Sequence, residues 1–142
     1  MEAKGKSLTT AVMLKDQDGA SNIGHEPEKR NGAEVLIRTL KAGDATNFPT
    51  KGDTCRVHYE GFLESGQKFD SSRGRQQVFL FRLGMEQVID GWDIAVAQMS
   101  RGQIAQITIP PTYGYADNGY PPVIPPKSTL IFEIELIDFA SL

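Results

Sequence analysis

The last strand-like run of the chain reads TLIFEIELI, from Thr129 to Ile137. Every second position in it carries a large apolar side chain, and these positions are Leu130, Phe132, Ile134 and Leu136. A period of two is typical of an antiparallel β-strand with one buried face. The run therefore predicts a strand whose apolar side faces a core.

An aromatic, proline-rich segment precedes this run and reads YGYADNGYPPVIPP, from Tyr113 to Pro126. Glycine and proline favour turns, and ordered loops on a rigid scaffold often carry function. The segment predicts a stiff loop that holds aromatic and aliphatic side chains over a cavity, as the rim of an apolar site.

Four other runs repeat the alternation and predict further strands of one sheet. The residues that share a face in each run are Val35, Ile37 and Thr39; Cys55, Val57 and Tyr59; Phe79, Phe81 and Leu83; and Ala105, Ile107 and Ile109.

One segment, Asp90 to Met99, changes to the period of a helix. Trp92, Ala95, Val96 and Met99 fall at positions i, i+3, i+4 and i+7, the stripe of a helix that packs on an apolar surface. Asp90 is the expected N-cap residue. One short helix against one antiparallel sheet predicts an α+β fold.

The chain of 142 residues is predicted to hold one domain, residues 33–142, after an N-terminal extension, residues 1–32. The extension is rich in Gly, Lys, Glu, Asp and Asn and has little periodicity, which is typical of a disordered tail. A docking or targeting arm that orders on a partner is the alternative.

Charge and hydropathy exclude several classes of partner. The net charge is -3 and no basic cluster occurs, which argues against nucleic acid or an anionic membrane surface. No segment has the roughly 20 apolar residues that cross a bilayer. The single cysteine, Cys55, is predicted to be a buried core thiol, which favours a reducing compartment. We expect the cytoplasm, with the nucleus as the alternative.

Residues for nucleophilic or metal chemistry are few. The two histidines are His25 in the extension and His58 on the polar face of a strand, and no cysteine and histidine set has zinc spacing. We interpret His58 as a surface or packing residue. The sequence predicts no metal site and no cofactor.

Twelve aromatic residues remain to be explained. Seven of them fall on inward faces, at the start of the helix or in the long loop, namely Tyr59, Phe69, Phe79, Trp92, Tyr115, Tyr120 and Phe132. They either line one cavity or simply fill the core between sheet and helix. Their positions alone do not decide between these interpretations.

Six motifs, in order, resemble the FKBP-type peptidyl-prolyl cis-trans isomerases. They are VHYEG at 57–61, GQKFDSSR at 66–73, QVIDGW at 87–92, MSRG at 99–102, YGY at 113–115, and IPP at 124–126 with LIFEIEL at 130–136. The similarity covers residues 33–139. It implies a strongly twisted antiparallel sheet, a half-barrel, wrapped around one short helix. It also implies a prolyl isomerase that tacrolimus and rapamycin inhibit.

The resemblance implies roles for individual residues. Trp92 would be the floor of the pocket and Phe69 and Tyr115 would flank the prolyl ring and the acyl group. The walls would be Tyr59, Phe79, Val88, Ile89 and Phe132, and the edge of the overhanging loop would be Val123 and Ile124.

Polar contacts follow from the same resemblance. The backbone N–H of Ile89 and the phenol of Tyr115 would donate to ligand carbonyls, and the Asp70 carboxylate would accept from the ligand. Arg75 matches the arginine that pairs with Asp70 and a rim tyrosine. Three residues depart from the commonest pattern, Gln87, Tyr120 and Val123, and they predict altered affinity and substrate preference.

Two functions remain open. The first is an isomerase that accelerates X-Pro rotation in peptides and folding proteins by desolvation in an aromatic pocket. The second is a non-catalytic adaptor module that binds a proline segment or a macrolide; a half-barrel with no ligand site is a weaker third. We expect a monomer, and whether a drug complex engages calcineurin stays open.

Overall fold

The computed structural model describes residues 32–141. The predicted disordered extension lies outside these residues except for Gly32, and so does His25. The described elements are β1 (Leu36–Lys41), β2 (Thr54–Leu63), β3 (Lys68–Ser71), α2 (Ser72–Arg75), β4 (Phe79–Arg82), α3 (Asp90–Val96), β5 (Ile104–Ile109), η1 (Pro111–Tyr113) and β6 (Leu130–Ala140).

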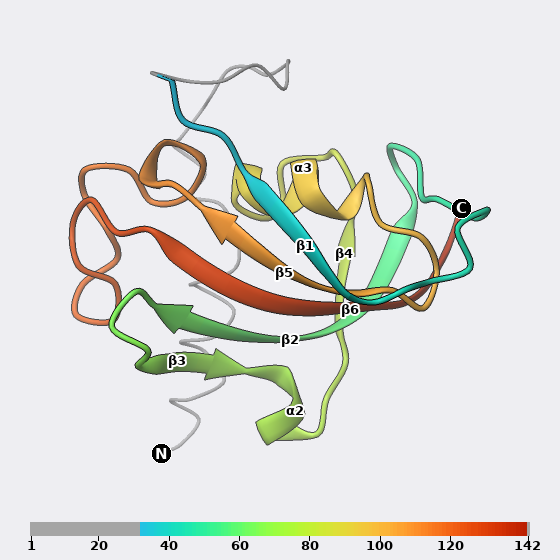
Figure 1. The fold of residues 1–142 in the computed structure, drawn as a ribbon, viewed down its shortest axis with the longest axis horizontal. Helices are drawn as coiled ribbons and strands as arrows, with labels where there is room; N and C mark the ends of the chain where they lie inside the picture. Colours follow the sequence, from blue (N-terminus) through green and yellow to red (C-terminus); the bar gives the residue numbers. More distant parts are fainter. Residues whose placement is uncertain (1–31, 142) are drawn as a thin grey trace.

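The strands form one antiparallel sheet in the order β1-β5-β6-β2-β3, and β4 also pairs with β2. The sheet twists strongly, and α3 lies beside it (Figure 1). The predicted α+β class, with a twisted antiparallel sheet around one short helix, is confirmed.

Strand β2 organises the sheet because both of its edges are paired. One edge follows β6 from Thr54, opposite Ala140, to Leu63, opposite Leu130. The other edge is divided between β4, which pairs with residues 54–57, and β3, which pairs with residues 60–62. The β2–β6 register shifts after Arg56, and such bulges increase local twist. The sheet can therefore curve around α3.

The inner face of the sheet and the stripe of α3 form the core. Trp92, Ala95 and Val96 of the predicted helical stripe lie on α3 and have no exposed surface, whereas Met99 is equally buried but lies beyond the end of α3 at Val96. Cys55 is a fully buried free thiol, as predicted. Burial, with the nearby negative charges of Asp53 and Asp93, raises the pKa of the Cys55 thiol to about 12.

The predicted N-cap of α3 is wrong. Ile89 holds the N-cap position in an extended conformation and makes no side-chain cap, so Asp90 is the first helical residue. The Ile89 side chain is 2% exposed, which means that core packing decides where the chain enters the helix. Asp90 still places negative charge in the first turn, where the helix dipole favours it.

Two single-turn elements were not predicted, α2 and η1. Helix α2 begins after Ser71, whose hydroxyl accepts the backbone N–H of Gly74 at 3.0 Å. It ends at Gln76, which has a left-handed backbone with φ of 57°. Four residues are too few to show a helical period, so hydrophobic patterning cannot detect such a turn.

Gly91→Ala tests the close packing of α3 on β5. A Cβ atom at Gly91 would lie 2.7–2.8 Å from three side-chain atoms of Ile109. Overpacking a core costs about 1–3 kcal/mol, and we expect this loss in the free energy of unfolding.

Gly74→Ala is the matched control for Gly91→Ala. Chemical denaturation measures the free energy of unfolding of both variants. A Cβ atom there would lie at least 3.4 Å from its neighbours, so we expect no loss of stability. Equal stability of the two variants would contradict the close approach of α3 and β5.

Candidate active site

The indole of Trp92 lies at the centre of a cluster of aromatic rings. It occupies the first turn of α3 and is fully buried. Four rings meet it nearly edge-on at centroid distances of 5.0–5.8 Å, and they belong to Tyr59, Phe79, Phe81 and Phe132. Each such pair adds about 0.5–1.5 kcal/mol beyond burial. The cluster therefore ties α3 to β2, β4 and β6.

The other apolar residues predicted for the site pack against the same core. Phe69 meets Phe132 edge-on at 5.7 Å, above Gly61, where a Cβ atom would lie 2.7 Å from the Phe69 ring. The remaining residues are Val88, Ile89 and Ile124, which are buried, and Tyr115, Tyr120 and Val123, which are partly buried. The structure brings these residues together, and their role in binding stays a prediction.

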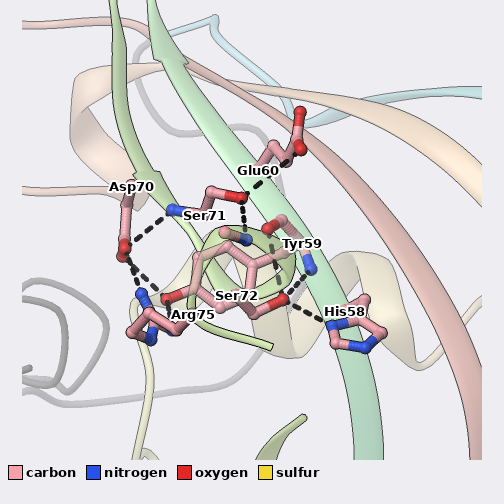
Figure 2. A network of polar contacts seen from close by, with 8 residues as sticks. His58, Tyr59, Glu60, Asp70, Ser71, Ser72 and Arg75 are labelled. Carbon is pink, nitrogen blue, oxygen red and sulfur yellow. Dashed lines mark hydrogen bonds and ion pairs between the residues drawn. The ribbon is translucent and has the colours of Figure 1, made fainter. Parts of the chain in front are cut away.

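A polar group borders the cluster beside Tyr59 (Figure 2). The Tyr59 phenol donates to Asp70 Oδ2 at 2.7 Å. Arg75 donates through Nη1 to Asp70 Oδ1 at 2.8 Å and through Nη2 to the Tyr59 oxygen at 3.3 Å. The predicted partnership of Arg75 with Asp70 is therefore present, and the tyrosine that completes it is Tyr59.

Burial and charge determine the protonation of this polar group. Burial, together with the charge and the hydrogen bond of Asp70, raises the pKa of the Tyr59 phenol well above its ordinary value. Burial opposes the charged form of Arg75, but Tyr59 and Asp70 raise its pKa on balance. Tyr59 is thus a neutral donor, and Arg75 is a cation that stabilises the Asp70 carboxylate.

Two buried donors beside the ring cluster have no hydrogen-bond partner among residues 32–141. These donors of the candidate site are the hydroxyl of Tyr115 and the indole N–H of Trp92. Burial, followed by the charges of Tyr120 and Asp70, raises the pKa of the Tyr115 phenol, so this hydroxyl keeps its proton. Buried polar groups rarely lack partners, and an unpaired one is costly. Each of the two donors is therefore available to an acceptor from outside residues 32–141.

The loop that carries Tyr115 and Tyr120 is closed by its own hydrogen bonds. The backbone N–H of Tyr120 donates to the Ile124 carbonyl at 2.7 Å, and that of Ile124 donates to the Tyr120 carbonyl at 2.8 Å. Gly119 has φ of +66°, and a Cβ atom there would lie 2.4 Å from the Ile124 carbonyl oxygen. These bonds agree with the predicted stiff loop.

Comparisons with known proteins address the same part of the chain. The family model described as FKBP-type peptidyl-prolyl cis-trans isomerase matches residues 45–137. FK506-binding protein 1 of Kluyveromyces lactis is 50% identical over 103 residues, which are 72% of this chain and 90% of the relative. The chain belongs to the FKBP-type isomerases.

Membership of the family makes the chain a peptidyl-prolyl cis-trans isomerase, so the predicted resemblance and enzyme class are confirmed. The match includes both donors without partners, the polar group at Asp70 and the loop from Tyr113 to Pro126. The isomerase therefore has its candidate site inside the family domain.

One residue that departs from the family pattern has a contact within the isomerase itself. The exposed Gln87 accepts the backbone N–H of Arg82 through Oε1 at 2.9 Å. An internal bond thus holds the amide oxygen of Gln87 near β4.

Sequence patterns missed three residues next to the site. Phe81 belongs to the ring cluster, and Ser72 and His58 form a hydrogen-bonded pair behind Tyr59. Phe81 was visible as a strand residue, but its alternation does not show which ring it meets. No periodic signal connects Ser72 with His58, which are 14 residues apart.

Residues 32–141 contain no candidate metal cluster and no candidate membrane span. This part of the isomerase has no group of three or more His, Cys, Asp or Glu residues placed to hold a metal ion. None of its helices combines the length and apolar character of a membrane span.

A double-mutant cycle with Asp70→Asn and Arg75→Met tests the buried ion pair. The side chains are 3% and 22% exposed, so their hydrogen-bonded attraction is little screened by water. We expect a coupling of about 1.5–3 kcal/mol in the free energy of unfolding.

The exposed pair of Arg56 and Asp138 is the matched control for this cycle. Its side chains are 48% and 46% exposed, and we expect a coupling below about 1 kcal/mol. Equal couplings in the two cycles would contradict a special role of the Asp70–Arg75 pair.

Alkaline titration tests the two buried phenols. In the folded isomerase the pKa values of Tyr59 and Tyr115 are raised above the ordinary value of 10.0, and in the unfolded chain they return to it. The stability that these phenols contribute is therefore present below about pH 10 and is lost as the pH rises above it.

Phenolate absorbance and circular dichroism follow ionisation and unfolding together. We expect part of the phenolate signal to appear only as the fold is lost, and this part to shrink in Tyr59→Phe and Tyr115→Phe. Full ionisation near pH 10 with an intact fold would refute the assignment.

Proposed function

We propose that the ring cluster around Trp92 binds a prolyl residue, and that this isomerase accelerates X-Pro rotation in peptides and folding proteins by taking the bond out of water. The Tyr115 hydroxyl is the observation that carries the proposal. It is buried, keeps its proton and has no hydrogen-bond partner in the part of the chain that the structure describes. A carbonyl of the substrate supplies the missing acceptor.

The chemistry needs no proton transfer. Resonance opposes rotation about the peptide bond with a barrier of about 18–20 kcal/mol. The planar amide is more dipolar than the twisted one, so an apolar environment reduces the advantage of the planar form. Donors aimed at carbonyls in the twisted geometry add to this effect. An acceleration of about 10^5-fold needs about 7 kcal/mol.

Each side of the site has a proposed task. Trp92 is the floor, Tyr59, Phe79, Val88, Ile89 and Phe132 are the walls, and Phe69 and Tyr115 flank the prolyl ring. The Asp70 carboxylate, held by Arg75 and Tyr59, accepts from the ligand, and the backbone N–H of Ile89 donates to it. Val123 and Ile124 form the edge, and Gln87 and Tyr120 tune affinity and preference.

We propose that the macrolides tacrolimus (FK506) and rapamycin compete for the same surface. The name of the relative from Kluyveromyces lactis supports this, because it describes an FK506-binding protein. Calcineurin is a proposed partner of the drug-loaded form only. We further propose a monomer in the cytoplasm or the nucleus, which agrees with the buried free thiol of Cys55.

A protease-coupled assay of a prolyl peptide tests catalysis. Tyr115→Phe removes one hydrogen bond from the proposed transition state, so we expect kcat/KM to fall about 5- to 30-fold. Phe69→Ala removes one side of the apolar site, and we expect a loss of at least the same size. The matched controls are Tyr113→Phe and Phe139→Ala, which alter residues with no proposed task.

Titration of Trp92 fluorescence with rapamycin separates catalysis from simple binding. Trp92 is the only tryptophan, so a saturable change reports on the proposed floor of the site. Binding without any acceleration of the peptide would favour the adaptor function. Activity that is unchanged in both Tyr115→Phe and Phe69→Ala would overturn the proposed site.

A further inference from the structure

Ser72 is the least exposed of the buried serine, aspartate and glutamine residues in residues 32–141. Ser72 is the first residue of α2 and has 0% of its surface exposed. The backbone N–H of Tyr59 donates to Oγ at 2.8 Å, and Oγ lies 3.3 Å from the Tyr59 carbonyl oxygen. Nδ1 of His58 is 2.8 Å from the same Oγ (Figure 2).

These distances do not decide which acceptor receives the hydroxyl hydrogen of Ser72. A serine hydroxyl has one hydrogen to donate and two lone pairs to accept with. Its hydrogen therefore has two acceptors within reach, Nδ1 of neutral His58 and the carbonyl of Tyr59. When His58 is protonated, Nδ1 becomes a donor, and the Ser72 hydrogen must turn to Tyr59.

One short segment holds Tyr59 at both of its ends. Asp70 and Arg75 bind its phenol, and Ser72 binds its backbone. The distance between these contacts is set by α2, a single turn that lies between Ser72 and Arg75. A shift of α2 against β2 therefore moves Arg75 relative to the Tyr59 ring.

Building on the proposed function of Tyr59, Asp70 and Arg75, we propose that Ser72 is a positioning residue of the isomerase. Its hydroxyl fixes α2 against β2, and His58 controls the direction of its hydrogen. Ser72 acts only through the residues that it holds in place, because its own side chain is shut off from solvent.

Several charged groups surround His58. Glu135 lies directly opposite on β6 and is paired with Arg73 of α2. Arg56 and Glu60 lie two residues away on the same face of β2. Their own partners are Asp138 for Arg56, and Lys68 and Ser71 for Glu60. The groups around His58 are thus of both signs, with Glu135 and Glu60 negative and Arg73 and Arg56 positive.

Ser72→Ala and Ser100→Ala form a matched pair of variants. Ser100 is 3% exposed, and its hydroxyl also accepts a backbone N–H, from Ala45 at 3.0 Å, but it has no contact with the candidate site. Loss of one hydrogen bond corresponds to about a tenfold effect, so we expect KM for the prolyl peptide to rise about tenfold in Ser72→Ala. We expect both variants to lose stability, and KM to be unchanged in Ser100→Ala.

The pH dependence of kcat/KM is a second measurement, and a mere loss of stability does not change its shape. All proteins carry His25→Asn, so that His58 is the only histidine in the sequence, and histidine is the side chain type that ordinarily changes charge between about pH 5 and pH 8. We expect a step of about threefold in kcat/KM over this range. The step should vanish in Ser72→Ala and in His58→Asn, because asparagine offers a polar atom at the place of Nδ1 without an ionisation.

The outcomes separate this proposal from the proposed function. Equal KM values for Ser72→Ala and Ser100→Ala, or a pH step that survives in Ser72→Ala, would overturn the role of Ser72 while the enzyme remains active. If Ser72→Ala does not fold, the His58→Asn variant tests the proposal. An unaltered pH dependence of kcat/KM in His58→Asn would overturn the role of His58. Failure of the function itself would show in Tyr115→Phe and Phe69→Ala.

Discussion

The edge-on packing of the Trp92 indole against rings from β2, β4 and β6 is the constraint on which the rest of the structure depends. Those rings can meet one indole only if the sheet twists and curves, and the divided edge of β2 and its bulge permit this. The helix must also approach closely, which Gly91 allows against Ile109. One short helix is then enough to close the core.

The same packing buries the Asp70 carboxylate beside Tyr59, and the segment from Asp70 to Arg75 helps to stabilise this charge. A carboxylate that is 3% exposed is costly unless a cation and hydrogen-bond donors satisfy it. Arg75, the Tyr59 phenol and the backbone N–H of Ser71 provide these contacts. The apolar cluster and its polar border are thus one structure, because Tyr59 belongs to both.

In the proposed mechanism, the site acts by its environment rather than by a reactive group. The groups that could attack or exchange protons are otherwise engaged, since Cys55 is a buried thiol with a raised pKa and His58 is bonded to Ser72. The cluster instead has apolar rings and two buried donors that have no partner within the described part of the chain. The proposed electrostatic preorganisation requires groups that stay in place, and the loop from Tyr115 to Ile124 is closed by hydrogen bonds of its own backbone.

Residue order alone determined which faces are apolar and which family the chain belongs to. The alternation in β2, β5 and β6 and the stripe of α3 predicted the buried residues correctly, because periodicity follows directly from strand and helix geometry. Only the tertiary structure decided the N-cap at Ile89, the single turn of α2, and the contacts of Ser72 with His58 and Tyr59. Those contacts join residues 13 and 14 positions apart across two elements, and a local pattern carries no information about which distant side chains will meet.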